Sequence, residues 1–277
     1  MTPRHWKSSN ACPCENLRGN TMSGIKLHSQ KALVTDDDMV SAPREALIVA
    51  HGQPGDFNPP EVELARLAVQ VQERMTGWRI QSATMACPGT LDTAAKDMSP
   101  GALVYPLFMT EGWFVQQALP ERLAAYQLQF LPPFGTDPEL PTLAALAIRR
   151  EIALRGWTPE LTHIVVAAHG SRRSPQAAGA VQQFTTALSS ILPCPAIQAG
   201  FLDQDPSIAR VATNLGRQAL CLPFFARDGD HISKDIPDAL TEARFKGVLL
   251  PVLGQQPLVP DLIARTLETA YTAKIPA

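Results

Sequence analysis

The chain has 277 residues, 45% of them hydrophobic and 18% charged, which is typical of a globular protein long enough for two domains. Its formal net charge of -2 provides no overall basic field and argues against nucleic acid as a partner. The sequence contains neither a signal-peptide pattern nor an uninterrupted apolar run of about 18 to 20 residues, so we expect a cytoplasmic protein without a membrane partner.

The first 42 residues show no sustained helical or strand periodicity. They mix Ser, Asn and Lys with the acidic run Asp36 to Asp38. We predict a flexible N-terminal extension over residues 1–42. Cys12 and Cys14, even with His5, make a weak metal site, because one proline separates the thiols and no predicted fold supports them.

From residue 46, short apolar runs alternate with amphipathic helical stretches, a pattern that indicates a parallel sheet covered on both faces. The predicted strands are 46–50, 81–86, 102–107 and 128–131. The predicted helices are 60–75, about 90–98, 115–126 and 138–154.

The same order recurs in the second half of the chain. Strands are predicted at 163–168, 196–202, 218–225 and 247–253, each followed by a helical pattern that ends near Tyr271. Turn-forming Gly and Pro residues repeat at an almost constant spacing, as in the pair His51-Gly52 and His169-Gly170. We therefore predict an internal duplication, with a first domain over 43–157 and a second over 158–277.

Three polar residues follow strands of the second copy. His169 follows the first strand, Asp203 the second and His231 the third. Ligands of open parallel sheets bind at the carboxyl ends of the strands, so these side chains are expected to converge. Neutral imidazole binds divalent transition metals and titrates near neutral pH. The three residues are predicted to be catalytic, with both histidines as metal ligands.

The first copy lacks one of these histidines. It keeps His51 but has Phe114 at the position that corresponds to His231. We expect a single metal-handling site in the second domain and a degenerate one in the first. Trp113 and Phe114 are candidates for a flat apolar surface against a macrocycle, with ordinary packing at the domain junction as the alternative.

Basic side chains near the two histidines are candidates for binding carboxylates of a substrate, because guanidinium and ammonium groups pair with such anions. Solvated surface charge is the competing interpretation for each of them. Asp235 precedes a predicted helix start, so helix capping is its plain role and orienting His231 is the alternative. The basic candidates are Arg172, Arg173, Arg227 and Lys234.

The segments AHGSRRSP, GFLDQDPSI and GDHISKDIPDAL resemble the motifs of the CbiX-type sirohydrochlorin chelatases, within the class II chelatase superfamily. The resemblance covers residues 46 to 270. It implies two tandem flavodoxin-like domains, each with a four-stranded parallel sheet flanked by helices, that face each other across a cleft. Asp203 departs from the pattern, since many relatives carry Glu there, and HGQPG replaces HGSR in the first copy.

The resemblance also implies an activity. This is the ATP-independent insertion of Co²⁺ or Fe²⁺ into sirohydrochlorin, or a related acidic tetrapyrrole, in cobalamin or sirohaem biosynthesis. It implies His169 and His231 as the residues that contact the metal, Asp203 as the acidic residue, and no cofactor beyond the substrate metal. The tetrapyrrole and the metal ion are the expected partners, and no oligomeric state is predicted. A metal or tetrapyrrole carrier without turnover is the alternative, and a metal-assisted hydrolase is a weaker one.

Overall fold

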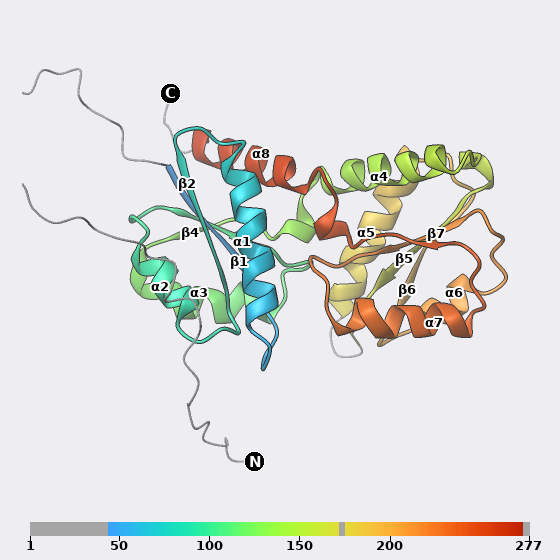
Figure 1. The fold of residues 1–277 in the computed structure, drawn as a ribbon, viewed down its shortest axis with the longest axis horizontal. Coiled ribbons are helices and arrows are strands. Elements are labelled where there is room, and N and C mark those ends of the chain that lie inside the picture. Colours follow the sequence, from blue (N-terminus) through green and yellow to red (C-terminus); the bar gives the residue numbers. More distant parts are fainter. Residues whose placement is uncertain (1–43, 172–174, 274–277) are drawn as a thin grey trace, which may run out of the picture.

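The computed structural model describes residues 44–171 and 175–273, so the predicted extension lies outside the described residues. The chain forms two four-stranded parallel sheets with strand orders β2-β1-β3-β4 and β6-β5-β7-β8 (Figure 1). The same order in both sheets confirms the predicted α/β fold class, with two four-stranded parallel sheets flanked by helices, and agrees with the predicted duplication. None of the helices in the described ranges is long and apolar enough to cross a membrane.

The first half follows the predicted succession of strands and helices. The predicted helix over 115–126 is divided, however: a π-helical turn at Phe114–Ala118 precedes the α-helix, and a 3₁₀ turn at Ala124–Tyr126 follows it. Pro120 has no N–H to donate to an i→i−4 bond, which favours the wider turn before it. The elements are β1 (Arg44–Ala50), α1 (Asn58–Gln72), β2 (Trp78–Thr84), α2 (Thr90–Lys96), β3 (Leu103–Pro106), α3 (Leu119–Leu123), β4 (Gln129–Phe130) and α4 (Leu140–Leu154).

The second half repeats this arrangement, including a π-helical turn at His231–Asp235 before its third helix. Its last strand is shorter than predicted, since Pro251 cannot donate a ladder hydrogen bond. The elements are β5 (His163–Ala168), α5 (Pro175–Ile191), β6 (Ile197–Phe201), α6 (Ile208–Ala212), β7 (Ala219–Pro223), α7 (Ile236–Glu242), β8 (Val248–Leu249) and α8 (Val259–Thr272).

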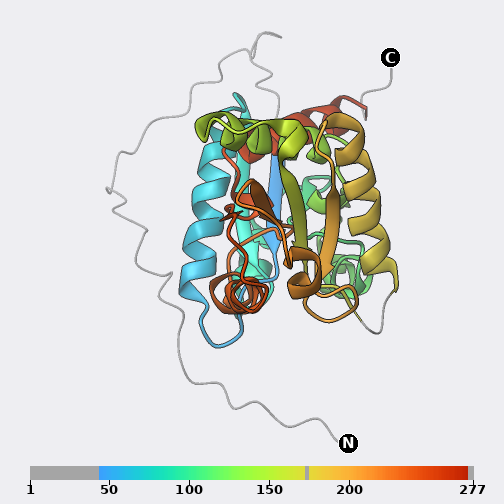
Figure 2. The ribbon, with the colours of Figure 1, turned by 90° about the vertical axis from the view of Figure 1, so that its right-hand side faces the viewer.

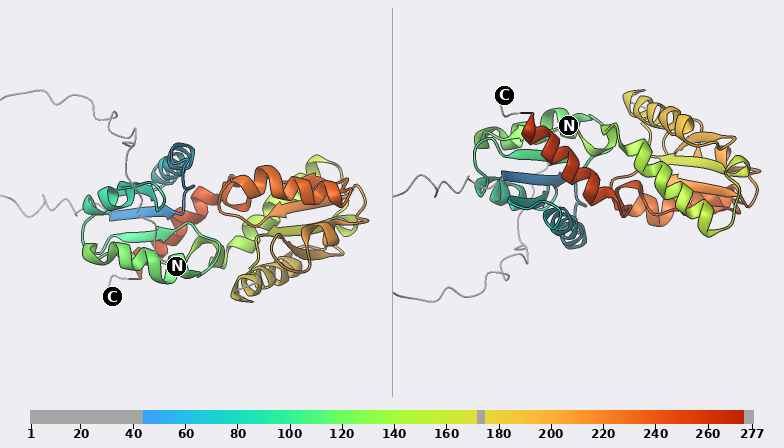
Figure 3. Two further views of the ribbon diagram at one scale, coloured as in Figure 1. Left: turned by 90° about the horizontal axis from the view of Figure 1, so that it is seen from below. Right: turned by 90° about the horizontal axis from the view of Figure 1, so that it is seen from above.

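The last helix of each half is exchanged between the halves (Figures 1 and 3). Helix α4 packs on α5 of the second half, where the Arg149 guanidinium donates to the Ile191 carbonyl at 2.8 Å. Helix α8 packs on α1 of the first half, and Glu268 accepts from the Trp78 indole N–H at 2.9 Å. The boundary of the sequence repeat near residue 157 is therefore not a boundary between two separate packing units.

Apolar side chains from both halves form one continuous core that includes the exchanged helices. Ile148 of α4 and Leu267 of α8 are both fully buried in it. The central strands β1, β3, β5 and β7 are buried on both faces, as their near-continuous apolar runs predicted, whereas the edge strands are partly exposed. Figure 2 shows helices on either side of the strands. The carboxyl ends of the strands are consequently the places where polar side chains can reach solvent.

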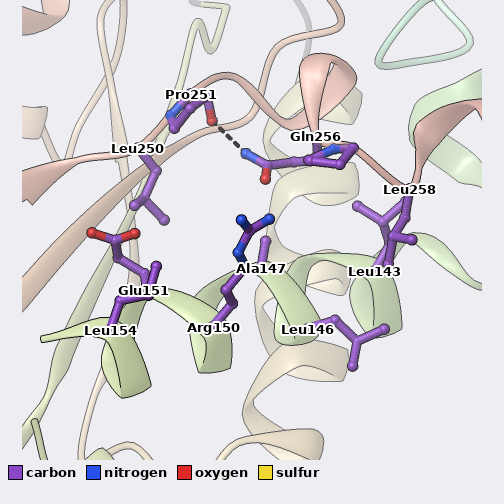
Figure 4. Close-up of a pocket in the computed structure, with 11 residues that line it drawn as sticks. Leu143, Leu146, Ala147, Arg150, Glu151, Leu154, Leu250, Pro251, Gln256 and Leu258 are labelled. Atoms are coloured by element: carbon purple, nitrogen blue, oxygen red, sulfur yellow. Dashed lines mark hydrogen bonds between the residues drawn. The ribbon is translucent and has the colours of Figure 1, made fainter. Parts of the chain in front are cut away.

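An apolar cavity of about 450 Å³ lies between α4 and the turn that leads into α8 (Figure 4). Leu146 and Leu258 line it, and the Arg150 guanidinium points into it. In the other half, the residues that correspond to these two leucines are Arg265 and Glu139, which form an ion pair at 2.7 Å. The cavity contains none of the predicted site residues.

Candidate functional site

His169 stands at the carboxyl end of β5, where the chain turns sharply. Gly170 makes this turn with a φ of +74°, a conformation that side chains disfavour. A Cβ atom at Gly170 would also lie 2.7 Å from the Gln204 side chain, which contacts the turn by accepting from the Ser171 N–H. The glycine therefore allows the loops after β5 and β6 to approach each other beside His169.

His231 is the first residue of the π-helical turn that follows β7, the strand next to β5. The ring centroids of His169 and His231 are 4.6 Å apart, and the ring planes are nearly perpendicular at 84°. Their side chains are 46% and 45% exposed, so a ligand can reach both rings. The structure thus brings together the two histidines that the sequence analysis singled out.

The hydrogen bonds of the two rings define which nitrogen atoms stay available. The Nδ1 atom of His169 lies 3.0 Å from the Gly170 carbonyl, and that of His231 lies 2.6 Å from the Asp235 carboxylate. A carbonyl or carboxylate oxygen only accepts, so each neutral ring carries its proton on Nδ1. The Nε2 lone pair of each ring is then available for a metal ion.

Asp203 follows β6 and lies beside His169. Its N–H donates to the His169 carbonyl at 2.9 Å, and its Oδ2 atom is 3.5 Å from Nδ1 of His169. The carboxylate is more than half exposed. It can therefore turn toward an approaching cation or accept a proton from one side of the histidine pair.

Asp235 does not cap a helix, contrary to the plain role expected of it. Its side chain makes no capping hydrogen bond, because the helical turn already begins at His231. The i,i+4 spacing within this turn places the Asp235 carboxylate against the His231 ring. The alternative interpretation, in which Asp235 orients His231, agrees with the observed contact.

The first half repeats this geometry without the polar groups. The rings of His51 and Phe114 are 4.4 Å apart at 73°, close to the arrangement of His169 and His231. The N–H of Ala86 donates to the His51 carbonyl at 2.8 Å, just as Asp203 donates to His169, so Ala86 corresponds to Asp203. Ala118 ends the π-helical turn where Asp235 ends the other. This half therefore retains one imidazole, whose Nδ1 lies 2.8 Å from the Gly52 carbonyl, and neither of the two carboxylates.

The predicted aromatic surface is exposed in the structure. Trp113 is 61% and Phe114 38% exposed, so neither is buried at a junction between the halves. Their rings are 5.1 Å apart in an edge-on arrangement. Phe108 lies beside Phe114 as Phe225 lies beside His231, at centroid distances of 6.3 and 6.2 Å.

The predicted basic residues differ in their placement. Arg172 and Arg173 lie outside the described residues. Lys234 is exposed on the π-helical turn. Arg227 is only 14% exposed and forms an ion pair with Glu63 of α1, a partner from the first half that has no local signal in the sequence. Burial lowers the pKa of Arg227, and the Glu63 carboxylate opposes that shift.

Within the ranges 44–171 and 175–273, no three His, Cys, Asp or Glu side chains are grouped so that they could enclose a metal ion. The arrangement at the second half is instead an open one, with two imidazoles and the Asp203 carboxylate exposed to solvent. The sequence analysis found these three residues from their positions after strands. It did not find Glu63, whose contact joins parts of the chain 164 residues apart.

Comparison with known proteins shows which proteins this chain is similar to. A family model described as CbiX matches residues 163–270. The structure of CbiX, described as the terminal enzyme for biosynthesis of siroheme in denitrifying bacteria, is 40% identical, with a TM-score of 0.76. That similarity covers 82% of this chain and 99% of the relative.

Two more distant proteins are also similar. A probable sirohydrochlorin cobaltochelatase of Halobacterium salinarum is 26% identical over 163 residues, or 49% of this chain; the chain spans about half of that relative, at 55%. The structure of SirB from Bacillus subtilis with Fe³⁺ has a TM-score of 0.66 at 17% identity and covers 84% of this chain and 97% of SirB. At that identity the similarity concerns the fold alone.

Proposed function

The chain belongs to the CbiX family, and from this premise we propose that it inserts a divalent metal ion, Co²⁺ or Fe²⁺, into sirohydrochlorin without ATP. The observation that carries the proposal is the pair His169 and His231, whose rings lie 4.6 Å apart. His169 follows β5, and His231 lies on the turn that follows the adjacent strand β7. In this proposal the metal ion is a substrate, received by the two Nε2 atoms. Imidazole nitrogen suits both ions.

Insertion exchanges two pyrrolic N–H protons for one M²⁺ ion, so the site must release a metal and accept protons in the same event. His169 and His231 give up the ion to the macrocycle nitrogens and can then take up protons on Nε2. Asp203 is placed beside His169 to stabilise the protonated ring or to accept a proton itself. Two neutral nitrogen ligands bind an ion less tightly than a closed cage of anionic ligands, which favours transfer over storage.

The macrocycle is proposed to dock against the exposed aromatic side chains Trp113 and Phe114 of the first half. Flat aromatic rings offer apolar area to a planar ligand. Arg172, Arg173 and Lys234 are proposed to bind its carboxylates, since they are close in sequence to the two histidines. In this arrangement the second half supplies the metal and the first half supplies part of the supporting surface.

The test is metal insertion followed by absorbance, with purified protein, sirohydrochlorin and either Co²⁺ or Fe²⁺, in the absence of ATP. We expect insertion faster than the spontaneous reaction. His231→Ala is expected to reduce the rate toward the spontaneous one while the variant still binds metal-free tetrapyrrole. His163→Ala, at the opposite end of β5, is the matched control and should retain the rate.

No acceleration by the wild-type protein with either metal would refute the proposal. A carrier is distinguished in the same experiment, because it would bind Co²⁺ or tetrapyrrole and leave the insertion rate at its spontaneous value.

A further inference from the structure

The loop that carries His231 has few polar contacts of its own. The Phe225 carbonyl accepts from the Gly254 N–H at 3.0 Å, and the Gly229 carbonyl accepts from Ile232 and Ser233 at 2.9 and 3.1 Å. Residues 226–228 lie between these two carbonyls. Among the described residues, the hydrogen bond from Arg227 to Glu63 is the one that they make. The path of the loop toward His231 thus depends on a side-chain contact.

That contact reaches across to the other half of the molecule. Glu63 lies on α1, and Arg227 is four residues before His231. The Arg227 side chain is largely buried, so loss of Glu63 would remove its hydrogen-bonded carboxylate and leave it with only the coulombic attraction of Asp228 and Glu61. The buried end of the pair is therefore the end on the His231 loop.

Open space surrounds the pair on both sides. Glu63 and Arg227 both line a cavity of about 580 Å³ between α1 and the turn before α8, and both line another of about 380 Å³ next to Asp230 and Ser233. These spaces reduce the packing between the loop and α1, although the Arg227 side chain itself is largely buried. The ion pair spans the gap instead.

The corresponding positions in the other half do not provide this ion pair. The residues that correspond to Arg227 and Glu63 are Thr110 and Val181, which cannot form an ion pair. The loop that begins at Thr110 leads to Phe114 rather than to a histidine. The cross-half ion pair is thus present at the loop that supplies an imidazole, and its counterpart is missing where no imidazole follows.

We propose that Glu63 is a positioning residue for His231: by holding Arg227 across the gap, it fixes the loop that places His231 opposite His169. The first half then contributes to metal handling through this contact as well as through its surface. The expected change in insertion rate rests on the proposed function. The effect of Glu63 on metal binding can be measured without turnover.

The experiment compares Glu63→Gln with Asp261→Asn in the full chain. Asp261 forms another ion pair across the halves, with Arg74 at 2.8 Å; Arg74 lines the same cavity as Glu63, but its guanidinium donates to Asp261 and the Gln70 carbonyl and not to the His231 loop. We expect Glu63→Gln to weaken Co²⁺ binding and to lower kcat by about tenfold, with the KM for tetrapyrrole changed by less than about twofold. Asp261→Asn should change the melting temperature to a similar extent and leave Co²⁺ affinity and kcat near wild type.

Exchanging the two charges of the ion pair tests whether the pair itself restores Co²⁺ binding. Glu63→Arg combined with Arg227→Glu is expected to recover part of the Co²⁺ affinity that Glu63→Arg alone loses. Unchanged Co²⁺ affinity in Glu63→Gln, or an equal loss in Asp261→Asn, would overturn the inference and leave the pair as a structural tie. If Glu63→Gln does not fold, Arg227→Gln, which removes the charge from the other side of the pair, must show the same selective loss.

The two proposals fail separately. A wild-type protein that does not accelerate insertion would refute the proposed function, whereas the Co²⁺ titrations of the variants would still decide whether Glu63 positions His231.

Discussion

The Nδ1 atom of His231 lies 2.6 Å from Oδ2 of Asp235, inside one π-helical turn. His169 instead directs its Nδ1 toward a backbone carbonyl, so the two imidazoles have different partners. A carboxylate holds the ring of a metal-binding histidine in one tautomer and makes the other nitrogen more basic. The pair is therefore asymmetric, with His231 the more strongly oriented ring.

Asp235→Ala is expected to weaken Co²⁺ binding and metal insertion by about 10- to 100-fold, because the His231 ring loses its acceptor. Asp235→Asn should lose less, since its amide oxygen still accepts from Nδ1. Co²⁺ titration and insertion rates measure both effects. Asp238→Asn, an exposed acid one turn further along, serves as the control. Equal activity of the Asp235→Ala variant and the wild type would show that the contact does not matter for the metal.

A second metal site can be introduced into the first half. Because His51 and Phe114 already have the geometry of the histidine pair, Phe114→His together with Ala118→Asp should complete it. Isothermal titration with Co²⁺ is expected to show one additional bound ion per chain. Phe114→Leu is the matched control, since it removes the ring without adding a ligand. An unchanged stoichiometry in a folded double variant would mean that ring geometry alone does not make the site.

Helix α8 follows the second half in sequence but packs on the first. We therefore expect α8 to stabilise the first half. Leu267 is fully buried in the common core, so Leu267→Ala should lower the free energy of unfolding by about 2–5 kcal/mol. Leu146 of α4 lines the open cavity and is 46% exposed, so Leu146→Ala should cost clearly less, about 1 kcal/mol or below. Urea unfolding followed by circular dichroism measures both. Similar small losses for the two variants would contradict the burial of α8 in this core.

The buried hydrogen bonds of Glu45 lead us to expect that the stability of the protein depends on pH. It is 7% exposed and accepts from the Ser99 N–H at 2.5 Å and the Arg79 guanidinium at 2.8 Å. Burial alone would raise the pKa of Glu45, but these hydrogen bonds outweigh it and hold the pKa below its usual value. The stabilisation is therefore complete above the unfolded-state pKa of about 4.3 and is lost as the pH falls through the lower folded value.

The measurement compares the wild-type protein with Glu45→Gln by urea unfolding at two pH values. At pH 7 the variant should be less stable by about 1–3 kcal/mol. The difference should shrink at pH 3. A difference that stays constant or grows on acidification would contradict the assigned role of these hydrogen bonds.

Much of the fold could be predicted because its signals are local. Apolar runs marked the strands, and the spacing of Gly and Pro revealed the duplication, with His51 and His169 at equivalent positions. The prediction that His169, His231 and Asp203 converge also followed from position, since parallel strands present their carboxyl ends at one edge. The boundaries of the predicted helix over 115–126 differ from the structure, because Pro120 favours a π-helical turn at its start.

Tertiary structure decided the rest. Whether Asp235 caps a helix or holds His231 depends on the turn in which it lies, and a sequence pattern does not distinguish an α-turn from a π-turn. Both sheets offer an apolar face that α4 or α8 could cover. The sequence therefore does not decide which helix packs on which sheet. The contact of Arg227 with Glu63 depends in turn on how the two halves are joined. The sequence determined which groups exist and on which strand ends they stand, whereas packing between distant segments decided which partners hold them.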